Sequence, residues 1–468
     1  MVNRLPLEEE VLARLLRPTA EERDYICGVA KNLLAAINKS GMAEGMVVGS
    51  IARNTWVKGD HDLDVFMLFD PAMPREALEA EGLALARKIA CQFTSNYHEK
   101  YAEHPYINAC IESIDVDIVP CYKVTSAGAI QSAVDRTPFH TRYITDKING
   151  LIDDVLLLKQ FFKTGGIYGS DQMTEGFSGY LCELLILYYG GFSALLTAAA
   201  DWRPHLVIDI ENHATKKFDE PLVVIDPVDP KRNVAAAVSL DRMVEFIELA
   251  RGYIESPDEK FFTLTQPQSI TQEHLVSLLR ERGTCLYAIT FATPPYIEEI
   301  VVPQLKRSVH AICEHLERNG FSVHHAHYQM HPERCMFLFE LLVGELPKIR
   351  KHMGPPLWNS VNAEKFRTTH ENDPLPGPFI VDGRYEMEVV REFTHAADIL
   401  SSVSLLNVRL GKHVRQSLEK DWMVLFGADC WQEEFAAFIY GFFERYSPLT
   451  RIRMTEEQEV PGEDQKKG

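Results

Sequence analysis

The stretch Val47–Phe69, VVGSIARNTWVKGDHDLDVFMLF, decides the fold of the N-terminal part of this 468-residue chain. It predicts a short apolar strand, a Gly49–Ser50 turn that opens a helix, and a second strand that starts at Asp62. Because strand side chains two apart share a face, Asp62 and Asp64 project together while the apolar residues between and after them enter a core. Carboxylates on one face can hold divalent metals, and free N–H groups at a helix start suit a phosphate oxygen. The stretch therefore predicts nucleotidyl-transfer chemistry.

A lone Asp-x-Asp is commonly just a surface turn before an ordinary strand. Here the Gly-Ser turn is followed by Arg53 one helical turn later, and a strand runs directly out of the Asp pair. The pattern GS-x-x-R followed by D-x-D resembles the signature of the DNA polymerase β-like nucleotidyltransferase superfamily.

Composition predicts a cytoplasmic protein of three or four domains with no membrane span. Hydrophobic residues make up 46% of the chain, which supports well-formed cores. No apolar run reaches the ~18 residues that a membrane helix needs. The nine cysteines form no C-x-x-C pair, which is typical of reduced thiols in the cytosol.

The formal net charge of −19 argues against indiscriminate nucleic-acid binding, which depends on Lys and Arg. Residues 303–352 oppose this trend, with seven Lys and Arg, five Asp and Glu, and seven His. An acidic protein with a locally basic segment fits a selective RNA partner.

The order of expected elements predicts an α+β, multidomain fold that begins with a catalytic head at residues 1–145. After the opening stretch, prolines start a long helix over about 71–96, and strands follow near 106–112 and 114–119, the second stopped by Pro120. This order favours a small mixed sheet with helices on one side.

A helical neck is expected at residues 146–257, because segments such as GFSGYLCELLILYYGGF carry broad apolar faces. Its stretch VVIDPVDPKRNVAAAV is expected to be a loop before the next helix. An α+β body and tail at 258–455 includes a β-α-β-β, ferredoxin-like piece. Residues 456–468 are charged and predict a flexible C-terminus.

A third carboxylate would complete a metal site, and the strand SIDVDIVPCY offers Asp115 and Asp117. Both would lie on one face because they are two apart. The local pattern does not choose between them.

Five segments in order resemble the archaeal, class I CCA-adding enzyme family of tRNA nucleotidyltransferases. They are VDIVPCYKV, SAVDRTPFHTRYI, LLKQFFKTGGIYG, GFSGYLCELLILYYGGF and DPVDPKRNVAAAVS. The resemblance implies that Asp62, Asp64 and Asp117 are the catalytic metal ligands. The first of these is often Glu in the family, so Asp62 departs in length and keeps the charge.

The resemblance also implies nucleotide-binding residues. Ser50 and Arg53 match phosphate-side residues, and His140 matches a residue near the incoming triphosphate. Arg232 matches the arginine that hydrogen-bonds the base. An arginine guanidinium can donate to the acceptors of both cytosine and adenine.

Further matches concern the phosphates and the RNA end. Lys159 matches a phosphate-binding lysine, with Lys163 one turn later as its rival, and Tyr168 matches a tyrosine at the nucleotide. Glu103 and His104 resemble family residues near the tRNA 3′ end.

The implied activity is template-independent addition of C, C and A to the 3′ end of tRNA, with CTP and ATP as substrates and two Mg²⁺ ions per active site. The implied partner is the acceptor and TΨC half of tRNA, and repair of tRNA 3′ ends and a homodimer are further expectations. The alternatives are another nucleotidyltransferase of this fold, such as a poly(A) polymerase or an oligoadenylate synthetase-like enzyme, and a non-catalytic RNA-binding protein.

Overall fold

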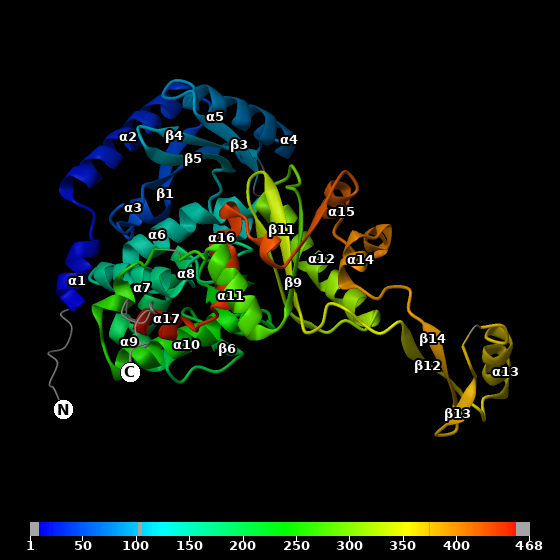
Figure 1. Ribbon diagram of the computed structural model, residues 1–468. Helices are drawn as coiled ribbons and strands as arrows, with labels where there is room; N and C mark the ends of the chain where they lie inside the picture. The colour runs from blue at the N-terminus through cyan, green and yellow to red at the C-terminus, as the bar shows by residue number, and fades with distance from the viewer. Residues whose placement is uncertain (1–8, 102–104, 267, 374, 455–468) are drawn as a thin grey trace, which may run out of the picture. The chain divides into compact units, whose positions relative to one another are not determined.

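The structure is a computed structural model of the chain, and it describes residues 9–101, 105–266, 268–373 and 375–454. The chain forms two compact units (Figure 1). The first contains the residues up to 265 together with those from 446 onward, and the second contains residues 266–445. The finer division into head, neck and body remains a prediction.

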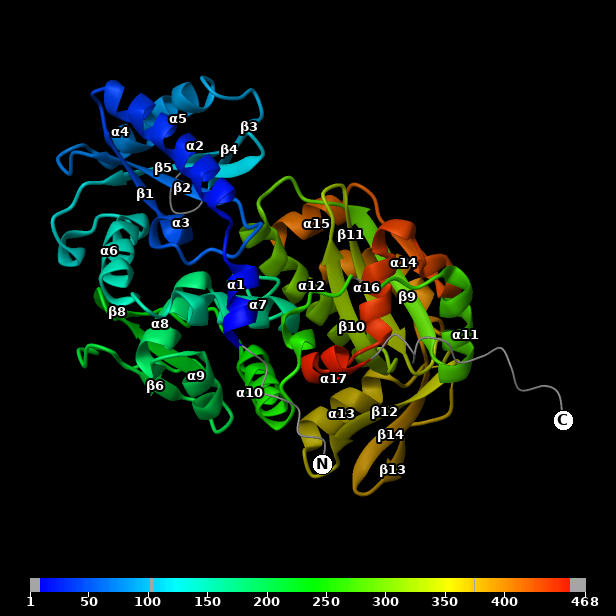
Figure 2. The same ribbon diagram turned by 90° about the vertical axis from the view of Figure 1, so that its left-hand side faces the viewer.

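A five-stranded mixed sheet organises the N-terminal part of the first unit. The elements are α1 (Glu9–Leu16), α2 (Ala20–Lys39), β1 (Glu44–Val48), α3 (Gly49–Arg53), β2 (Asp62–Phe69), α4 (Arg75–Ala77), α5 (Leu83–Ala90), β3 (Tyr97–Tyr101), β4 (Pro105–Ile111) and β5 (Ile114–Tyr122). The strand order is β1-β2-β5-β4-β3, with β2 and β5 parallel and the other pairs antiparallel. Helices α2 and α5 cover one face, where Leu33, Ile89 and Val65 share a core (Figures 1 and 2). The expected mixed sheet with helices on one side is confirmed.

The strand β5 does not stop at Pro120, as expected, but continues to Tyr122. Pro120 still pairs with Met67 of β2, whereas the pairing of β5 with β4 ends at Ile118. The missing N–H of Pro120 therefore falls on a side of the strand with no ladder to complete, which is where a sheet tolerates proline.

The long helix expected over 71–96 is present but shorter, and it contains an irregular turn. It starts at Arg75, passes through a π-helical turn at Leu78–Gly82, and ends with α5 at Ala90. Gly82 lies directly against the sheet, since a Cβ there would be 2.8 Å from the Cβ of Pro120. The close approach of this turn to β5 is what the periodicity could not reveal.

The rest of the first unit is built on helices with a phenylalanine-rich core. The helices are α6 (Thr137–Lys147), α7 (Ile152–Gly165), α8 (Gly179–Tyr189), α9 (Phe192–Ala199), α10 (Leu240–Glu255) and α17 (Pro448–Arg453). Phe161, Phe162 and Phe246 are fully buried in this core. Arg451 of α17 donates to the carbonyl of Gly165 at 3.1 Å, so α17 packs with this unit although it follows the second unit in sequence.

The stretch expected to be a loop before α10 forms strands instead. A small sheet has the order β6 (Leu206–Ile208), β7 (Leu222–Asp226) and β8 (Asp229–Asn233). The β-branched run of β7 is entirely buried, and an Asp-Pro-rich turn returns the chain into β8. Lys231 and Arg232 therefore lie on a strand.

The second unit contains the expected ferredoxin-like piece. Its elements are α11 (Gln272–Arg282), β9 (Cys285–Ala292), α12 (Glu298–Arg318), β10 (Val323–Met330), β11 (Arg334–Leu341), β12 (Ile349–Pro356), α13 (Ser360–Thr369), β13 (Phe379–Val381), β14 (Arg384–Val390), α14 (Ala396–Ser401), α15 (Lys412–Leu418), β15 (Met423–Phe426) and α16 (Ala436–Phe443). The main sheet has the order β10-β11-β9-β15, and a smaller one has the order β12-β14-β13. Because β11 lies between β9 and β10, the β9-α12-β10-β11 run is the expected split β-α-β-β unit.

Within the described ranges, no single helix is long and apolar enough to cross a membrane. Helices α8 and α9 together have the required length and composition, with a bend of 91° between them. Most of their apolar side chains belong to the buried core of the first unit.

Candidate active site

The pairing of β2 with β5 gathers four carboxylates on one face of the sheet. The parallel register sets Asp62 opposite Asp115 and Asp64 opposite Asp117. Leu63, between Asp62 and Asp64 on β2, is buried in the core on the other face. The two candidates that the sequence left open, Asp115 and Asp117, therefore both lie on this carboxylate face.

Asn108 of β4 connects the two carboxylates of β5. Its side-chain amide donates to Asp115 Oδ1 at 2.5 Å and to Asp117 Oδ1 at 2.7 Å. Asp115 is exposed, whereas Asp117 is half-buried beside Asp64. Sequence reasoning missed Asn108, although a polar residue inside the apolar alternation YINACI was a signal.

Electrostatics at this face favours a bound cation. Burial, with repulsion from Asp117, raises the pKa of Asp64 to about 6, and Arg53 opposes that rise. Burial also raises the pKa of Asp62 and of Asp117. A set of oxygen ligands with uncompensated negative charge matches the preference of Mg²⁺.

The residues present therefore fit a divalent metal by chemistry, although they do not enclose one. In the described part of the chain, no three His, Cys, Asp or Glu side chains are spaced to hold an ion as they stand. Repulsion separates like charges, so the carboxylates would have to draw together around a cation.

The Gly-Ser turn lies against Asp64. Gly49 has φ +72°, and a Cβ there would be 2.1 Å from Asp64 Oδ2, so only glycine fits. Ser50 follows in the first turn of α3, and Val48, the N-cap residue of that helix, makes no side-chain capping hydrogen bond. The turn and the carboxylate face are thus direct neighbours, as the sequence predicted.

Arg53 and Lys159 lie in a buried polar cluster beneath the turn. Arg53 Nε donates to Glu183 Oε1 at 2.9 Å, and the Thr55 hydroxyl bonds the same oxygen. Lys159 Nζ donates to the carbonyl of Thr55 at 2.6 Å. Arg53 also reaches Thr141 of α6, with Nη1 3.3 Å from its hydroxyl. This cluster connects α3 to helices α6, α7 and α8.

The two lysines of α7 have different surroundings. Burial lowers the pKa of Lys159, whose ammonium is in the interior. Lys163 is partly exposed, binds Asp60 Oδ1 at 2.6 Å, and lies 5.4 Å from the ring centre of Tyr168. Lys163 also acts on the Asp62 carboxylate electrostatically, so it borders the carboxylate face.

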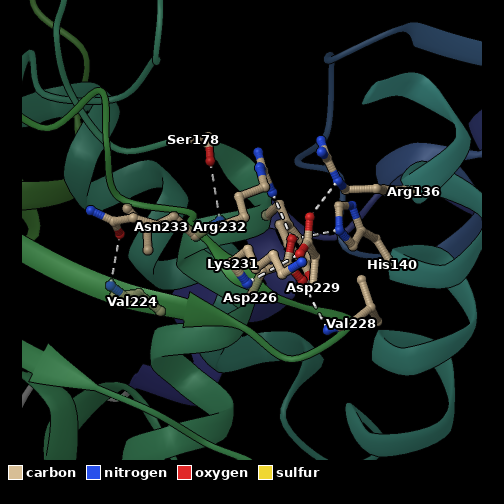
Figure 3. A network of polar contacts seen from close by, with 12 residues as sticks. Arg136, His140, Ser178, Val224, Asp226, Val228, Asp229, Lys231, Arg232 and Asn233 are labelled. Carbon is tan, nitrogen blue, oxygen red and sulfur yellow. Dashed lines mark hydrogen bonds and ion pairs between the residues drawn. The ribbon is translucent and has the colours of Figure 1, made fainter. Parts of the chain in front are cut away.

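His140 and Arg232 meet at a residue that sequence reasoning missed, Asp226 (Figure 3). His140 Nε2 and Arg232 Nη1 are each 2.8 Å from Asp226 Oδ2. The His140 ring stacks on Tyr180 with centroids 4.2 Å apart. The signal for Asp226 was its place in the Asp-Pro-rich stretch that was expected to be a loop.

The predicted site residues thus fall into three groups within the first unit: the carboxylate face with Ser50, the buried cluster of Arg53 and Lys159, and the pair formed by His140 and Arg232. Tyr168 lies beside Lys163. Glu103 and His104 are outside the described residues.

Family models cover most of the chain. They match as "Nucleotidyltransferase domain" over residues 31–140, "tRNA nucleotidyltransferase, second domain" over 153–263, and "CCA-adding enzyme, C-terminal domain" over 282–427. The CCA-adding enzyme of Methanoregula boonei is 70% identical over 99% of this chain and 100% of its own length. The chain belongs to the CCA-adding enzyme family.

A more distant relative also matches most of the chain. The CCA-adding enzyme of Methanosarcina mazei is 41% identical over 88% of this chain and 92% of its own. Among solved structures, the E. coli MS115-1 CdnC:HORMA-deltaN complex matches 57% of this chain and 94% of that chain with 16% identity and a TM-score of 0.45. The family assignment rests on the sequence relatives.

Replacing Asp64 with Asn should stabilise the metal-free protein. At pH 8 the Asp64 carboxylate is ionised against a raised pKa, so removing its charge should raise the free energy of unfolding by about 1–3 kcal/mol. The gain should shrink as the pH falls through about 6 toward 4, because the wild-type carboxyl then takes up a proton. Urea unfolding in EDTA measures this.

The same variant should lose stabilisation by Mg²⁺, which the wild type should show. Asp115→Asn is the matched control on the same face, and it should keep the Mg²⁺ effect. A less stable Asp64→Asn in EDTA, or an unchanged response to Mg²⁺, would contradict this interpretation of the carboxylate face.

Glu183→Gln should destabilise the first unit strongly. It leaves the buried Arg53 and Lys159 without their counter-charge, and breaking a buried ion pair costs about 3–5 kcal/mol. Glu211→Gln, which removes the surface pair with Lys147, should cost about 1 kcal/mol or less. Urea titrations of both variants test this, and equal, small effects would show that the buried cluster contributes little.

Proposed function

We infer that this protein adds C, C and A in turn to the 3′ end of tRNA, using CTP and ATP without a nucleic-acid template and releasing pyrophosphate. The observation that carries this conclusion is the 70% identity with a CCA-adding enzyme over nearly the whole of both chains. Repair of tRNA 3′ ends would follow from the same reaction on a shortened tRNA.

Asp62, Asp64 and Asp117 would hold two Mg²⁺ ions, the first two residues being shared between them. When bound, Mg²⁺ supplies positive charge against the triphosphate and the reacting 3′-hydroxyl. Asn108 orients the carboxylate of Asp117, and Gly49 lets the turn approach the carboxylate of Asp64 closely.

The nucleotide would lie between the carboxylate face and the helices of the same unit. We place Ser50 and the N–H groups of α3 at the phosphates, together with Lys163, because its ammonium borders the carboxylate face. Tyr168 lies beside that lysine. Arg53 and Lys159 act from beneath, adding positive charge through groups that already have protein partners.

Base selection would depend on Arg232, with His140 near the triphosphate. An arginine fork donates to the acceptors that cytosine and adenine share in position, whereas guanine and uracil present an N–H at one of them. Glu103 and His104 stay proposed contacts of the tRNA 3′ end.

The tRNA partner would be bound through its acceptor and TΨC half. In the second unit, the basic segment 303–352 includes the exposed Arg350 and Lys351 of β12, which suit phosphates. We propose that the enzyme works in the cytoplasm, and a homodimer is compatible with this scheme.

A direct test is incubation with tRNA that ends at the position before its CCA, Mg²⁺ and single or paired nucleotides. CTP alone should give two additions, CTP with ATP should give three, and UTP and GTP should give almost none. Asp64→Asn should lower the rate by about 100-fold or more, since it removes charge stabilisation of several kcal/mol, while Asp115→Asn should stay active.

The products are read on a sequencing gel. An open-ended homopolymer would identify a different nucleotidyltransferase on this fold. An inactive wild type that still binds tRNA would indicate a non-catalytic RNA-binding protein.

A further inference from the structure

We propose that Asp226 is a positioning residue that fixes the direction of the Arg232 fork and the tautomer of His140, and thereby determines which bases the enzyme accepts. This rests on the proposed placement of Arg232 at the nucleotide base. Asp226 is the last residue of the buried strand β7, and its side chain has no exposed surface. Its position is therefore set by the small sheet and not by solvent.

The Asp226 carboxylate has partners on both oxygens. Oδ1 accepts from the backbone N–H of Val228 at 3.0 Å and from the Tyr180 hydroxyl at 3.3 Å. Oδ2 accepts from His140 Nε2 and from Arg232 Nη1, each at 2.8 Å (Figure 3). A carboxylate held in this way cannot rotate without giving up at least two hydrogen bonds.

The charge of the Asp226 carboxylate determines which ring nitrogen of His140 carries the proton. Burial alone would raise the pKa of Asp226, but hydrogen bonds from His140 and Arg232 outweigh it and lower the pKa to about 2. An ionised carboxylate only accepts, so His140 must carry its proton on Nε2. Burial lowers the pKa of His140, so the ring is neutral at pH 7 and its Nδ1 is an acceptor.

The bond to Asp226 also explains how Arg232 can bind the nucleotide base and not the triphosphate. A free guanidinium would bind a phosphate oxygen in preference to a neutral base. Here one terminal nitrogen is bound to a buried carboxylate, while the side chain keeps 37% of its surface exposed. The remaining N–H donors are held in one direction, as base recognition requires.

The test compares Asp226→Asn with Asp229→Asn in the same hairpin. Asp229 pairs with Arg136 at 2.9 Å, and neither Arg232 nor His140 is among its bonded partners in the described residues. An Asn at 226 has one acceptor oxygen, so its NH2 must face either His140 and Arg232 or Val228 and Tyr180, and in both orientations Arg232 loses its negatively charged partner. We expect the preference for CTP over UTP, as a ratio of kcat/KM values, to fall about 10- to 100-fold, the range for hydrogen bonds to charged groups. Asp229→Asn should keep the wild-type ratio, and both should keep the wild-type Mg²⁺ dependence.

A double-mutant cycle separates positioning from a merely structural role. If Asp226 acts through Arg232, the preference for CTP in Asp226→Asn with Arg232→Ala should equal that of Arg232→Ala alone. Additive losses, or an unchanged preference in Asp226→Asn, would overturn the proposal.

A milder variant keeps the proposal testable if Asp226→Asn does not fold. Tyr180→Phe removes one donor from the carboxylate without changing charge, and it should reduce the preference for CTP about 3-fold, because this hydrogen bond, at 3.3 Å, is the longest of the four that the carboxylate accepts. No change in that variant would then contradict the proposal. If the wild-type protein adds no C, C and A to tRNA, the proposed function itself is refuted. The activity of the wild type is therefore measured before that of any variant.

Discussion

The parallel pairing of β2 with β5 is the constraint on which the rest of the site depends. It sets Asp62 opposite Asp115 and Asp64 opposite Asp117, with the apolar residues of both strands in the core behind them. The sheet therefore holds four acidic side chains close together, and repulsion and burial raise the pKa of Asp64. Such a face opposes folding and favours a cation, which is how functional sites commonly depart from what stability alone would select.

Two buried carboxylates complete the first unit around that face. Glu183 of α8 binds Arg53 from α3, and Asp226 of β7 binds His140 of α6 and Arg232 of β8. Glu183 comes from a helix and Asp226 from the small sheet. Each accepts hydrogen bonds from side chains that we propose to act at the nucleotide. Two of these three contacts join residues more than 80 positions apart in sequence, and they give the site a fixed frame.

The sequence predicted the parts of the site that depend on local periodicity. Alternation along β2 placed Asp62 and Asp64 on one face, and the Gly-Ser turn was correctly expected beside them. The family assignment followed from motifs that are contiguous in the chain. The π-helical turn in the helix before β3 was missed because it depends on the close contact of Gly82 with Pro120. The hairpin of β7 and β8 was missed because the burial of β7 depends on residues remote in sequence.

The roles of single charged residues were harder to predict, since their partners are remote in sequence. Nothing near Arg53 indicates that Glu183, 130 residues later, neutralises it. Glu183 itself lies in an apolar helix where it interrupts the pattern, and that interruption was the one available signal. The alternatives Asp115 and Asp117 share a strand face, so only the buried position beside Asp64 separates them.

The most direct test of the account is where a divalent metal binds. Crystals grown with Mn²⁺ and CTP would show the ions in an anomalous difference map. We expect two peaks at the carboxylate face, about 2.1 Å from oxygens of Asp62, Asp64 and Asp117, with Asp115 outside the coordination sphere. Ions bound through Asp115 in place of Asp117, or no ion at this face, would contradict it.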